Sequence, residues 1–232
     1  MANPEYDTWL SVGGYIHTSG TTGPKKSILQ SPEKITASNI AAIMAQKLGT
    51  ESRVLTVGKL KHAGGIFAQT LPAYTIGASI KVDNFNPLFF TQIIKSYTHT
   101  HLTPIQAKDV MDTDINVDYK GIWITCGSDR VHWNVIEHFV ERGATFMANW
   151  GMTEVGPIAI NSVFTSLDQV LEAKEKCPKD YTLLGNTFYC DYKILNEELI
   201  VKGNISVYGD NWFATSDLVK EVDGNLYFKG RK

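Results

Sequence analysis

The sequence predicts an α/β fold, in which a largely parallel sheet flanked by helices is followed by a small β-rich subdomain. The 232 residues are 43% apolar and 11% aromatic, which is enough for a substantial core. Short apolar runs alternate with helical patterns as far as residue 148, as in proteins built from strand–helix–strand units. Beyond about residue 155 the chain changes to short strands separated by turns. We therefore expect two units, residues 1–155 and 156–232.

The first unit is predicted to begin with a strand over residues 11–16. A helix is expected from Ser31-Pro32-Glu33, because proline is favoured at the first helical position, and Gly49 should end it. The rest of the unit alternates. Strands are expected over residues 53–57, 78–82, 99–102, 121–125 and 144–148, and helices over residues 64–74, 87–97, 104–111 and 133–142.

The second unit is predicted to be mainly β-structure. Gly, Asn and Asp turns separate its apolar runs, and one charged segment over residues 167–176 has a helical pattern. Its strands are expected over residues 158–164, 182–189, 191–195, 198–202, 213–220 and 226–229.

Charge and cysteine content exclude several classes of protein. The formal net charge is −2 and the lysines are scattered, so we expect no nucleic-acid partner. The three cysteines lack CxxC or Cys/His spacing, which argues against a disulfide framework or a zinc site. Neither a signal peptide nor a long apolar run is present, so we expect no membrane span and a cytoplasmic protein.

The segment from His17 to Lys26 has the composition of a phosphate-binding loop. Glycines bring backbone N–H groups close to a ligand, hydroxyls donate to phosphate oxygens, and lysine supplies positive charge. It is not a Walker A loop, because that pattern needs Gly-Lys-Ser/Thr beginning five residues after its first glycine, and Lys25 stands at that distance from Gly20. A solvated hairpin turn is the alternative. The candidate ligands are Thr18, Ser19, Gly20, Thr21, Thr22, Gly23 and Lys26.

Three later segments carry further candidate ligands. Residues 149–154 follow a predicted strand, and the Thr153 hydroxyl and Glu154 carboxylate suit a Mg²⁺·phosphate site. Asp217, in Thr215-Ser216-Asp217, has the acceptors to bind ribose hydroxyls. Arg231 stands at the end of the chain. Taken singly, each segment also fits a plain turn or a frayed chain end.

Together, these segments resemble the motifs of the adenylate-forming superfamily, which includes acyl-CoA synthetases, firefly-type luciferases and the adenylation domains of non-ribosomal peptide synthetases. Residues 18–27 resemble the T-S-G-T-T-G-x-P-K-G loop, with Lys25 at the proline and Ser27 at the last glycine. Residues 150–154 resemble Y-G-x-T-E, with Trp150 for tyrosine. Residues 215–217 resemble T-G-D, with Ser216 for glycine, and Ala214 replaces the arginine before it.

Weaker similarities lie between these motifs in the same order. Residues 61–65 look like the family's His/Gly segment at the acid pocket, residues 126–129 like its adenine loop, and residues 198–203 like its G-E-L-x-V-x-G strand. The resemblance therefore extends over essentially the whole chain.

The resemblance implies ATP-dependent activation of a small carboxylic acid as an acyl-adenylate, with release of pyrophosphate and often transfer to coenzyme A (CoA). It implies that the loop binds the β,γ-phosphates, Thr153 the α-phosphate, and Glu154 the metal Mg²⁺. Trp150 would stack on adenine beside Gly127 and Ser128, with Asn149 and Gly151 in the same cofactor-binding set. Asp217 and Arg231 would bind ribose, and His62 would stand at the mouth of the acid pocket.

Full-length members of this superfamily also have a large N-terminal subdomain and a mobile C-terminal domain with a catalytic lysine, for which this sequence has no counterpart. We therefore expect impaired adenylation, doubtful CoA transfer, and an uncovered apolar helix face that favours a homo-oligomer or a complementing domain in trans. The acid pocket is expected around Phe67, Trp123 and Met152. The alternatives are a nucleotide-binding module without turnover and a piece of a longer protein.

Overall fold

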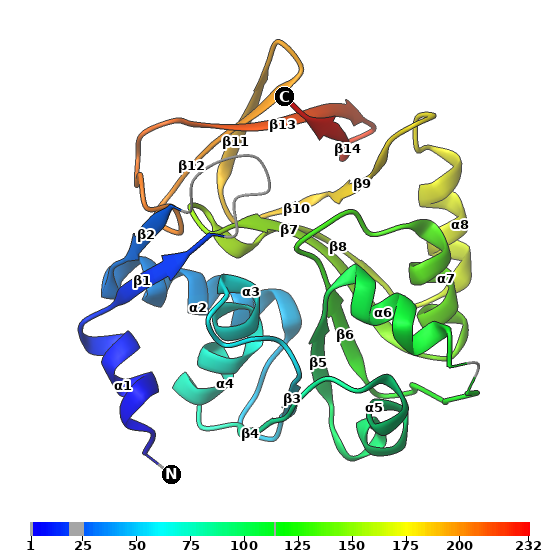
Figure 1. Ribbon diagram of the computed structural model, residues 1–232. Helices are drawn as coiled ribbons and strands as arrows, with labels where there is room; N and C mark the ends of the chain where they lie inside the picture. Colours follow the sequence, from blue (N-terminus) through cyan, green and yellow to red (C-terminus); the bar gives the residue numbers. More distant parts are fainter. Residues whose placement is uncertain (1, 19–25, 114) are drawn as a thin grey trace.

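The computed structural model describes residues 2–18, 26–113 and 115–232. Within these residues the strands form a seven-stranded sheet, a five-stranded sheet and a short hairpin (Figure 1). The hairpin pairs β1 (Gly14–His17) with β2 (Ser27–Gln30) in antiparallel register. The predicted fold class, a largely parallel sheet flanked by helices with an additional β-rich part, is confirmed.

The seven-stranded sheet has the order β10-β8-β7-β6-β5-β3-β4. Its strands from β4 to β7 pair in parallel, and β8 and β10 add an antiparallel edge. The carboxyl ends of the parallel strands therefore meet at one edge, where ligands bind in open α/β sheets. The strands are β3 (Arg53–Thr56), β4 (Ser79–Val82), β5 (His99–Leu102), β6 (Trp123–Cys126), β7 (Thr145–Met152), β8 (Gly156–Phe164) and β10 (Thr187–Phe188).

Helices cover both faces of this sheet (Figure 1). One face is covered by α2 (Pro32–Gln46), α3 (Ala63–Gly65), the π-helical turn η1 (Ile66–Thr70) and α4 (Leu71–Thr75). The other is covered by α5 (Pro87–Ile93), the 3₁₀ turn η2 (Ile94–Ser96), α6 (Pro104–Met111), α7 (Trp133–Glu141) and α8 (Leu167–Glu175).

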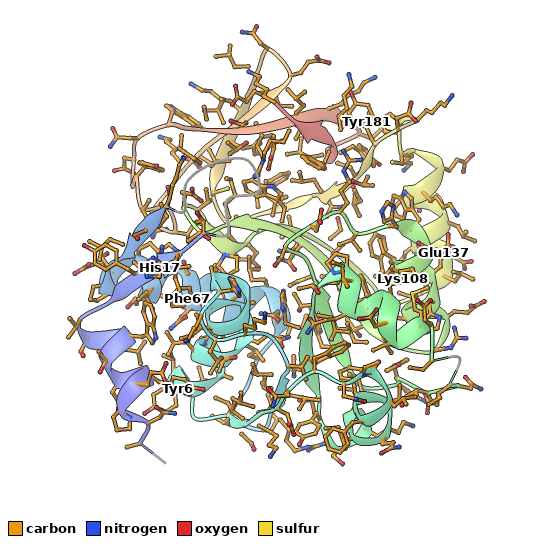
Figure 2. The ribbon with its side chains drawn as sticks, in the orientation of Figure 1. Tyr6, His17, Phe67, Lys108, Glu137 and Tyr181 are labelled. Carbon is orange, nitrogen blue, oxygen red and sulfur yellow. The ribbon has the colours of Figure 1, made fainter. Side chains whose placement is uncertain are left out.

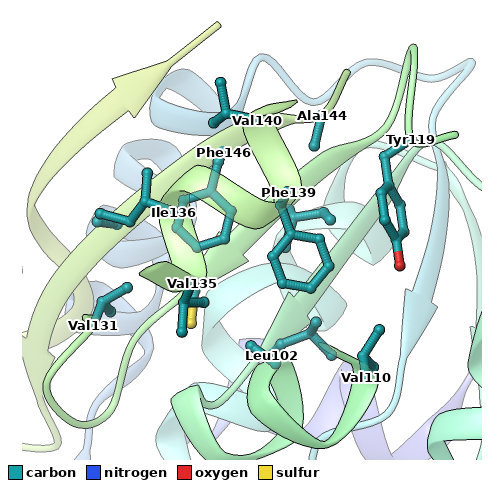
Figure 3. Packing of buried hydrophobic residues seen from close by; sticks show 14 of the residues in the cluster. Leu102, Val110, Tyr119, Val131, Val135, Ile136, Phe139, Val140, Ala144 and Phe146 are labelled. Atoms are coloured by element: carbon teal, nitrogen blue, oxygen red, sulfur yellow. The ribbon is translucent and has the colours of Figure 1, made fainter. Parts of the chain in front are cut away.

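The largest core cluster lies between the sheet and this second group of helices (Figure 3). On α7, Val135, Ile136, Phe139 and Val140 are buried at the three- and four-residue spacing of one helix face. Phe139 stacks on Phe146 of β7, with ring centroids 5.8 Å apart. Burying each such side chain contributes about 1.5–3 kcal/mol, so this face anchors α7 to the sheet.

The first element, α1 (Pro4–Ser11), was not predicted. The Asn3 side chain accepts a hydrogen bond from the backbone N–H of Glu5 at 3.1 Å, and Pro4 occupies the first helical position. Asn3-Pro4-Glu5 therefore has the same start signal as Ser31-Pro32-Glu33, from which the helix α2 was predicted. The predicted strand over residues 11–16 shifts accordingly to Gly14–His17.

The predicted helix over residues 64–74 is divided into α3, η1 and α4. Pro72 has no N–H to donate to the carbonyl of Ala68, as a regular α-helix would require. That carbonyl instead accepts from the Gln46 side chain at 2.7 Å. The proline thus accounts for the break, and α2 satisfies the freed backbone group.

The five-stranded sheet is antiparallel and has the order β11-β12-β13-β14-β9. A second core cluster, which includes Val155, Leu184, Leu199 and Val219, packs it against β8. The strands are β9 (Thr182–Gly185), β11 (Asp191–Leu195), β12 (Glu198–Lys202), β13 (Phe213–Val222) and β14 (Asn225–Arg231).

Two strands predicted for the β-rich subdomain belong to the larger sheet. β8 forms a hairpin with β7, so the division expected between residues 155 and 156 falls inside that hairpin. The predicted strand over residues 182–189 divides into β9 and β10, which lie in different sheets. Gly185, the last residue of β9, has a φ of 148°, and any side chain there would meet the backbone of Asn161.

Candidate functional site

The base of the predicted phosphate loop is a closed hairpin. The Thr18 N–H donates to the Lys26 carbonyl at 2.9 Å, and the Lys26 N–H donates to the Thr18 hydroxyl at 3.3 Å. The Lys26 side chain is exposed. The candidate ligands Ser19, Gly20, Thr21, Thr22 and Gly23 lie outside the described residues. The structure thus describes the two ends of the loop.

Three of the predicted nucleotide ligands meet at one point between the two sheets. The Trp150 indole N–H, from β7, donates to Asp217 Oδ2 at 2.8 Å. Arg231 Nε, opposite Asp217 on β14, donates to Asp217 Oδ1 at 2.8 Å. Asp217 is only 2% exposed, so its charge is desolvated; the Arg231 guanidinium balances that charge, and the Trp150 N–H satisfies the second oxygen. This ion pair also raises the pKa of Arg231.

Thr153 and Glu154 form the turn that joins β7 to β8. Residues 149–154 were expected to follow a strand; β7 instead continues to Met152, and Thr153 and Glu154 stand directly beyond its end, where the chain turns back into β8. The Thr153 carbonyl accepts from the Gln30 side chain at 3.2 Å, and the Glu154 carbonyl accepts from the Val207 N–H at 2.8 Å. Gln30 is the last residue of β2, so this turn lies against the strand that leaves the phosphate loop.

The charges of Glu154 and Asp217 act on the same guanidinium. Glu154 contributes to the raised pKa of Arg231, after the larger effect of the hydrogen bond from Arg231 to Asp217. Among the described residues, no group of three or more His, Cys, Asp or Glu side chains comes together to hold a metal ion. A single carboxylate here is compatible with Mg²⁺, which commonly binds through one or two carboxylates, water and phosphate oxygens.

The residues expected beside adenine lie at the carboxyl ends of β6 and β7. Gly127 is buried, and a side chain there would collide with Asn149. Asn149 Nδ2 donates to the Pro157 carbonyl at 2.6 Å, whereas its Oδ1 has no partner within the described chain although Asn149 is only 7% exposed. Ser128 is exposed and has a φ of 80°. Asn149 therefore has an unpartnered buried acceptor directly beside Gly127.

Gly151 has a structural role in the hairpin. A side chain at this position would meet the backbone of Gly156 and Pro157 on the facing strand. The glycine in the Trp-Gly-Met-Thr-Glu segment is therefore required by close strand packing, whether or not a ligand binds.

His62 and His101 lie near the same edge of the sheet. His62 is exposed and directly precedes α3. His101, at the end of β5, was not predicted as a site residue. A side chain built at Gly64 would lie 3.0 Å from the Ser128 hydroxyl and 3.4 Å from the His101 ring, so the three residues converge. Burial lowers the pKa of His101 to about 4. In the sequence, the one feature that could have indicated His101 as a site residue is its position near the carboxyl end of a predicted parallel strand.

The side chains expected around the acid pocket belong to three different core clusters. Phe67 packs edge-on against Trp9, among the N-terminal elements that also carry Tyr6 and His17 (Figure 2). Trp123 and Met152 belong to two other clusters, and Ala68, next to Phe67, shares the cluster of Trp123.

Ser216 replaces the glycine of the T-G-D motif at a backbone position that favours glycine. Its φ is 65°, in the left-handed region. The Ser216 N–H donates to Glu198 Oε1 at 2.8 Å, and the other oxygen of Glu198 accepts from Lys232 at 2.6 Å. Both interactions lower the pKa of Glu198, with Lys232 as the larger cause. Glu198 thus holds the turn beside Asp217 despite the serine.

The fold and the site define a nucleotide-binding α/β protein of the adenylate-forming type. A family model described as AMP-binding enzyme matches residues 11–215. The chain therefore belongs to the AMP-binding enzyme family.

Similar proteins include CoA ligases. The chain is 26% identical over 247 residues to an indoleacetate–CoA ligase from Aromatoleum aromaticum, with 93% of this chain and 47% of the relative covered. It is 25% identical over 237 residues to a 2-succinylbenzoate–CoA ligase from Staphylococcus aureus strain Newman, with 93% of this chain and 46% of the relative covered. The chain thus spans about half the length of these relatives.

A solved structure shares the fold. The o-succinylbenzoate CoA synthetase from Bacillus subtilis, in complex with its acyl-adenylate intermediate, superposes with a TM-score of 0.80 at 19% identity. That likeness covers 96% of this chain and 63% of the synthetase chain. No helix among the described residues is long and apolar enough to cross a membrane.

Proposed function

We propose that this chain binds ATP and AMP at the edge where its two sheets meet, and that it activates a small carboxylic acid as an acyl-adenylate. The observation that supports this most strongly is the meeting of Trp150, Asp217 and Arg231, which come from two sheets and were each expected at the nucleotide. Asp217 is buried with both oxygens engaged, so its position is fixed before any ligand arrives.

Each segment of the site has a role in this proposal. The phosphate loop and Lys26 bind the β,γ-phosphates, and the Thr153 hydroxyl contacts the α-phosphate. Asp217 and Arg231 bind the ribose hydroxyls. Adenine lies between the Trp150 ring and the loop of Gly127 and Ser128, with Asn149 behind that loop. Gly151 supports this arrangement through the hairpin.

Glu154 is the proposed metal ligand. Mg²⁺, when bound, offsets the charge of the phosphates, and Glu154 supplies one carboxylate to hold it. Two backbone carbonyls of its turn accept hydrogen bonds, one from the Gln30 side chain and one from the Val207 N–H. These bonds hold the turn that carries the Glu154 carboxylate.

The proposed reaction is an adenylyl transfer. A carboxylate oxygen of the acid forms a bond to the α-phosphorus, the bond from that phosphorus to the bridging oxygen breaks, and pyrophosphate leaves with the electron pair. No proton is transferred in this step, so the chain acts by positioning the reactants and balancing their charge. His62 stands at the entrance for the acid. The structure of the synthetase relative with an acyl-adenylate supports this reaction class.

Transfer to CoA is a weaker part of the proposal, because the chain spans about half the length of its CoA ligase relatives. We propose that a second copy or a separate domain completes the site in trans.

A nucleotide-binding role without turnover is the second candidate. It is favoured by two departures from the family motif beside Asp217: the strained Ser216, and the exposed Ala214 in place of an arginine. Both changes leave Asp217, Thr153 and Glu154 in place, so they affect turnover more than binding.

Exchange of labelled pyrophosphate into ATP distinguishes the two candidates. Incorporation of label that depends on an added carboxylic acid, and that is lost in Asp217→Ala, is the result expected of a ligase. Measurable ATP affinity without exchange, for a pool that includes indoleacetic, ferulic and 2-succinylbenzoic acids, would reject the ligase and favour the binding module. Absence of both would reject the proposed site.

A further inference from the structure

Lys34 is a buried lysine beside the candidate site that no role assigned above uses. It lies in the first turn of α2 and is only 4% exposed. Burial of an ammonium group is costly and is normally retained only where partners offset it. Its Nζ donates to Gln30 Oε1 at 2.6 Å and lies 5.5 Å from the centre of the Phe67 ring.

The hydrogen bond from Lys34 determines how the Gln30 amide is oriented. An ammonium group only donates, so Gln30 Oε1 must face Lys34 and the NH₂ group must point the other way. That NH₂ group donates to the carbonyls of Thr153 at 3.2 Å and Ile28 at 3.4 Å. Gln30 is fully buried, so these contacts have no competition from solvent.

This chain of contacts joins two parts of the nucleotide site. Gln30 ends the strand that leaves the phosphate loop, and Thr153 begins the turn that carries Glu154. Burial lowers the pKa of Lys34 to about 7, and the negative charge of Glu154 acts in the opposite direction. The charge of Glu154 therefore favours the protonated form of Lys34, which donates to Gln30 and orients its amide.

We propose that Lys34 is a positioning residue of the nucleotide site, which acts through Gln30 to hold the Thr153–Glu154 turn in register with the phosphate loop. The inference rests on the proposed function, since Glu154 matters only if it serves Mg·ATP. Lys34 itself touches no reactant.

Lys34→Met tests the proposal, because it keeps the length of the side chain and removes the charge and the donor. Lys34→Met leaves the buried Gln30 oxygen without its donor, so the unfolding temperature is expected to fall slightly. The double variant Lys34→Met with Gln30→Met removes both partners and should restore that temperature. We expect Mg·ATP affinity, measured by calorimetry, to fall at least about tenfold. Lys47→Met, at an exposed position directly after the same helix, is the matched control and should bind as the original chain does.

Amide hydrogen exchange of the ligand-free protein gives a second readout. The Val155 N–H donates to Met152 and the Val207 N–H donates to Glu154, so both report on the turn. Their exchange should accelerate about tenfold in Lys34→Met and in Gln30→Met, with amides of β11 and β12 unchanged.

The two readouts separate failure of this inference from failure of the proposed function. Unchanged exchange at Val155 and Val207 would overturn the inference, as would unchanged Mg·ATP affinity or a lower unfolding temperature with faster exchange throughout the chain. If the original protein does not bind Mg·ATP, the proposed function fails. In that case, faster exchange confined to the turn in Lys34→Met would still support the contact that runs from Lys34 through Gln30 to Thr153.

Discussion

The indole N–H of Trp150 donates to the carboxylate of Asp217 at 2.8 Å, across the junction of the two sheets. The two residues are far apart in the sequence, and each was expected to contact the nucleotide rather than the other. Trp150 stands where the family motif has tyrosine, so in this chain the aromatic residue also fixes the orientation of the carboxylate that we propose binds ribose. A first prediction concerns this contact.

Trp150→Phe keeps an aromatic ring and removes the donor. A buried carboxylate that loses a hydrogen bond is destabilised by about 1–3 kcal/mol, so we expect a lower unfolding temperature and weaker AMP binding, measured by thermal unfolding and calorimetry. Trp212→Phe, at an exposed tryptophan, is the control and should change neither. Identical behaviour of the two variants would show that the contact with Asp217 is unimportant.

Glu154→Gln should remove the dependence of ATP binding on Mg²⁺. The amide keeps the size of the side chain and loses the charge that attracts the metal, so titrations with Mg²⁺ and with a chelator should give the same ATP affinity. Glu175→Gln, on the exposed face of α8, should keep the difference between the two titrations. A normal response of Glu154→Gln to Mg²⁺ would place the metal ligand elsewhere.

Ser216→Gly should stabilise the protein. Ser216 has a φ of 65°, and a non-glycine residue in this region costs about 1 kcal/mol or more. Greater flexibility of glycine in the unfolded chain offsets part of the gain, so we expect an increase of up to about 1 kcal/mol in the free energy of unfolding, measured with urea. Ser216→Ala keeps the Cβ atom and should give no increase. An equal gain in both variants would point to the hydroxyl group instead.

His101 should make stability depend on pH. Burial lowers its pKa to about 4 in the folded protein, below the ordinary value of 6.5. Between these values the unfolded chain binds more protons, so the free energy of unfolding should fall as pH falls from about 6.5 to 4, by up to about 1.4 kcal/mol per pH unit. Urea unfolding across this range should show a shallower slope for His101→Gln than for His17→Gln, which changes an exposed histidine. Equal slopes would contradict the prediction.

The outer face of α2 should mediate association. Ile40 and Met44 are 53% and 64% exposed, and Ile40 borders a hollow of about 550 Å³ between α2 and Asn204. Apolar side chains grouped in this way commonly mark a partner surface. Light scattering at increasing concentration should show self-association that Ile40→Lys with Met44→Lys abolishes. A monomer at high concentration would contradict the prediction for a homo-oligomer.

Local sequence signals were sufficient for most of the elements. Pro32 after Ser31 predicted the start of α2, and the alternation of apolar runs predicted the parallel strands from β3 to β7. The same reasoning missed α1, although Asn3-Pro4 carries an equivalent start signal. These features depend on neighbours in the chain, because capping, proline geometry and periodicity act over a few residues.

Only the tertiary structure decided which residues distant in the sequence contact one another. The motifs at residues 150–154 and 215–217 identified Trp150 and Asp217 as site residues, but not their hydrogen bond to each other. The roles of Lys34 and His101 were likewise invisible, since nothing local marks a lysine or histidine as buried. The sequence by itself determined the family, the fold class and the residue types of the site. Which donors meet which acceptors depended on how the two sheets pack, because burial and hydrogen-bond geometry arise from contacts between distant segments.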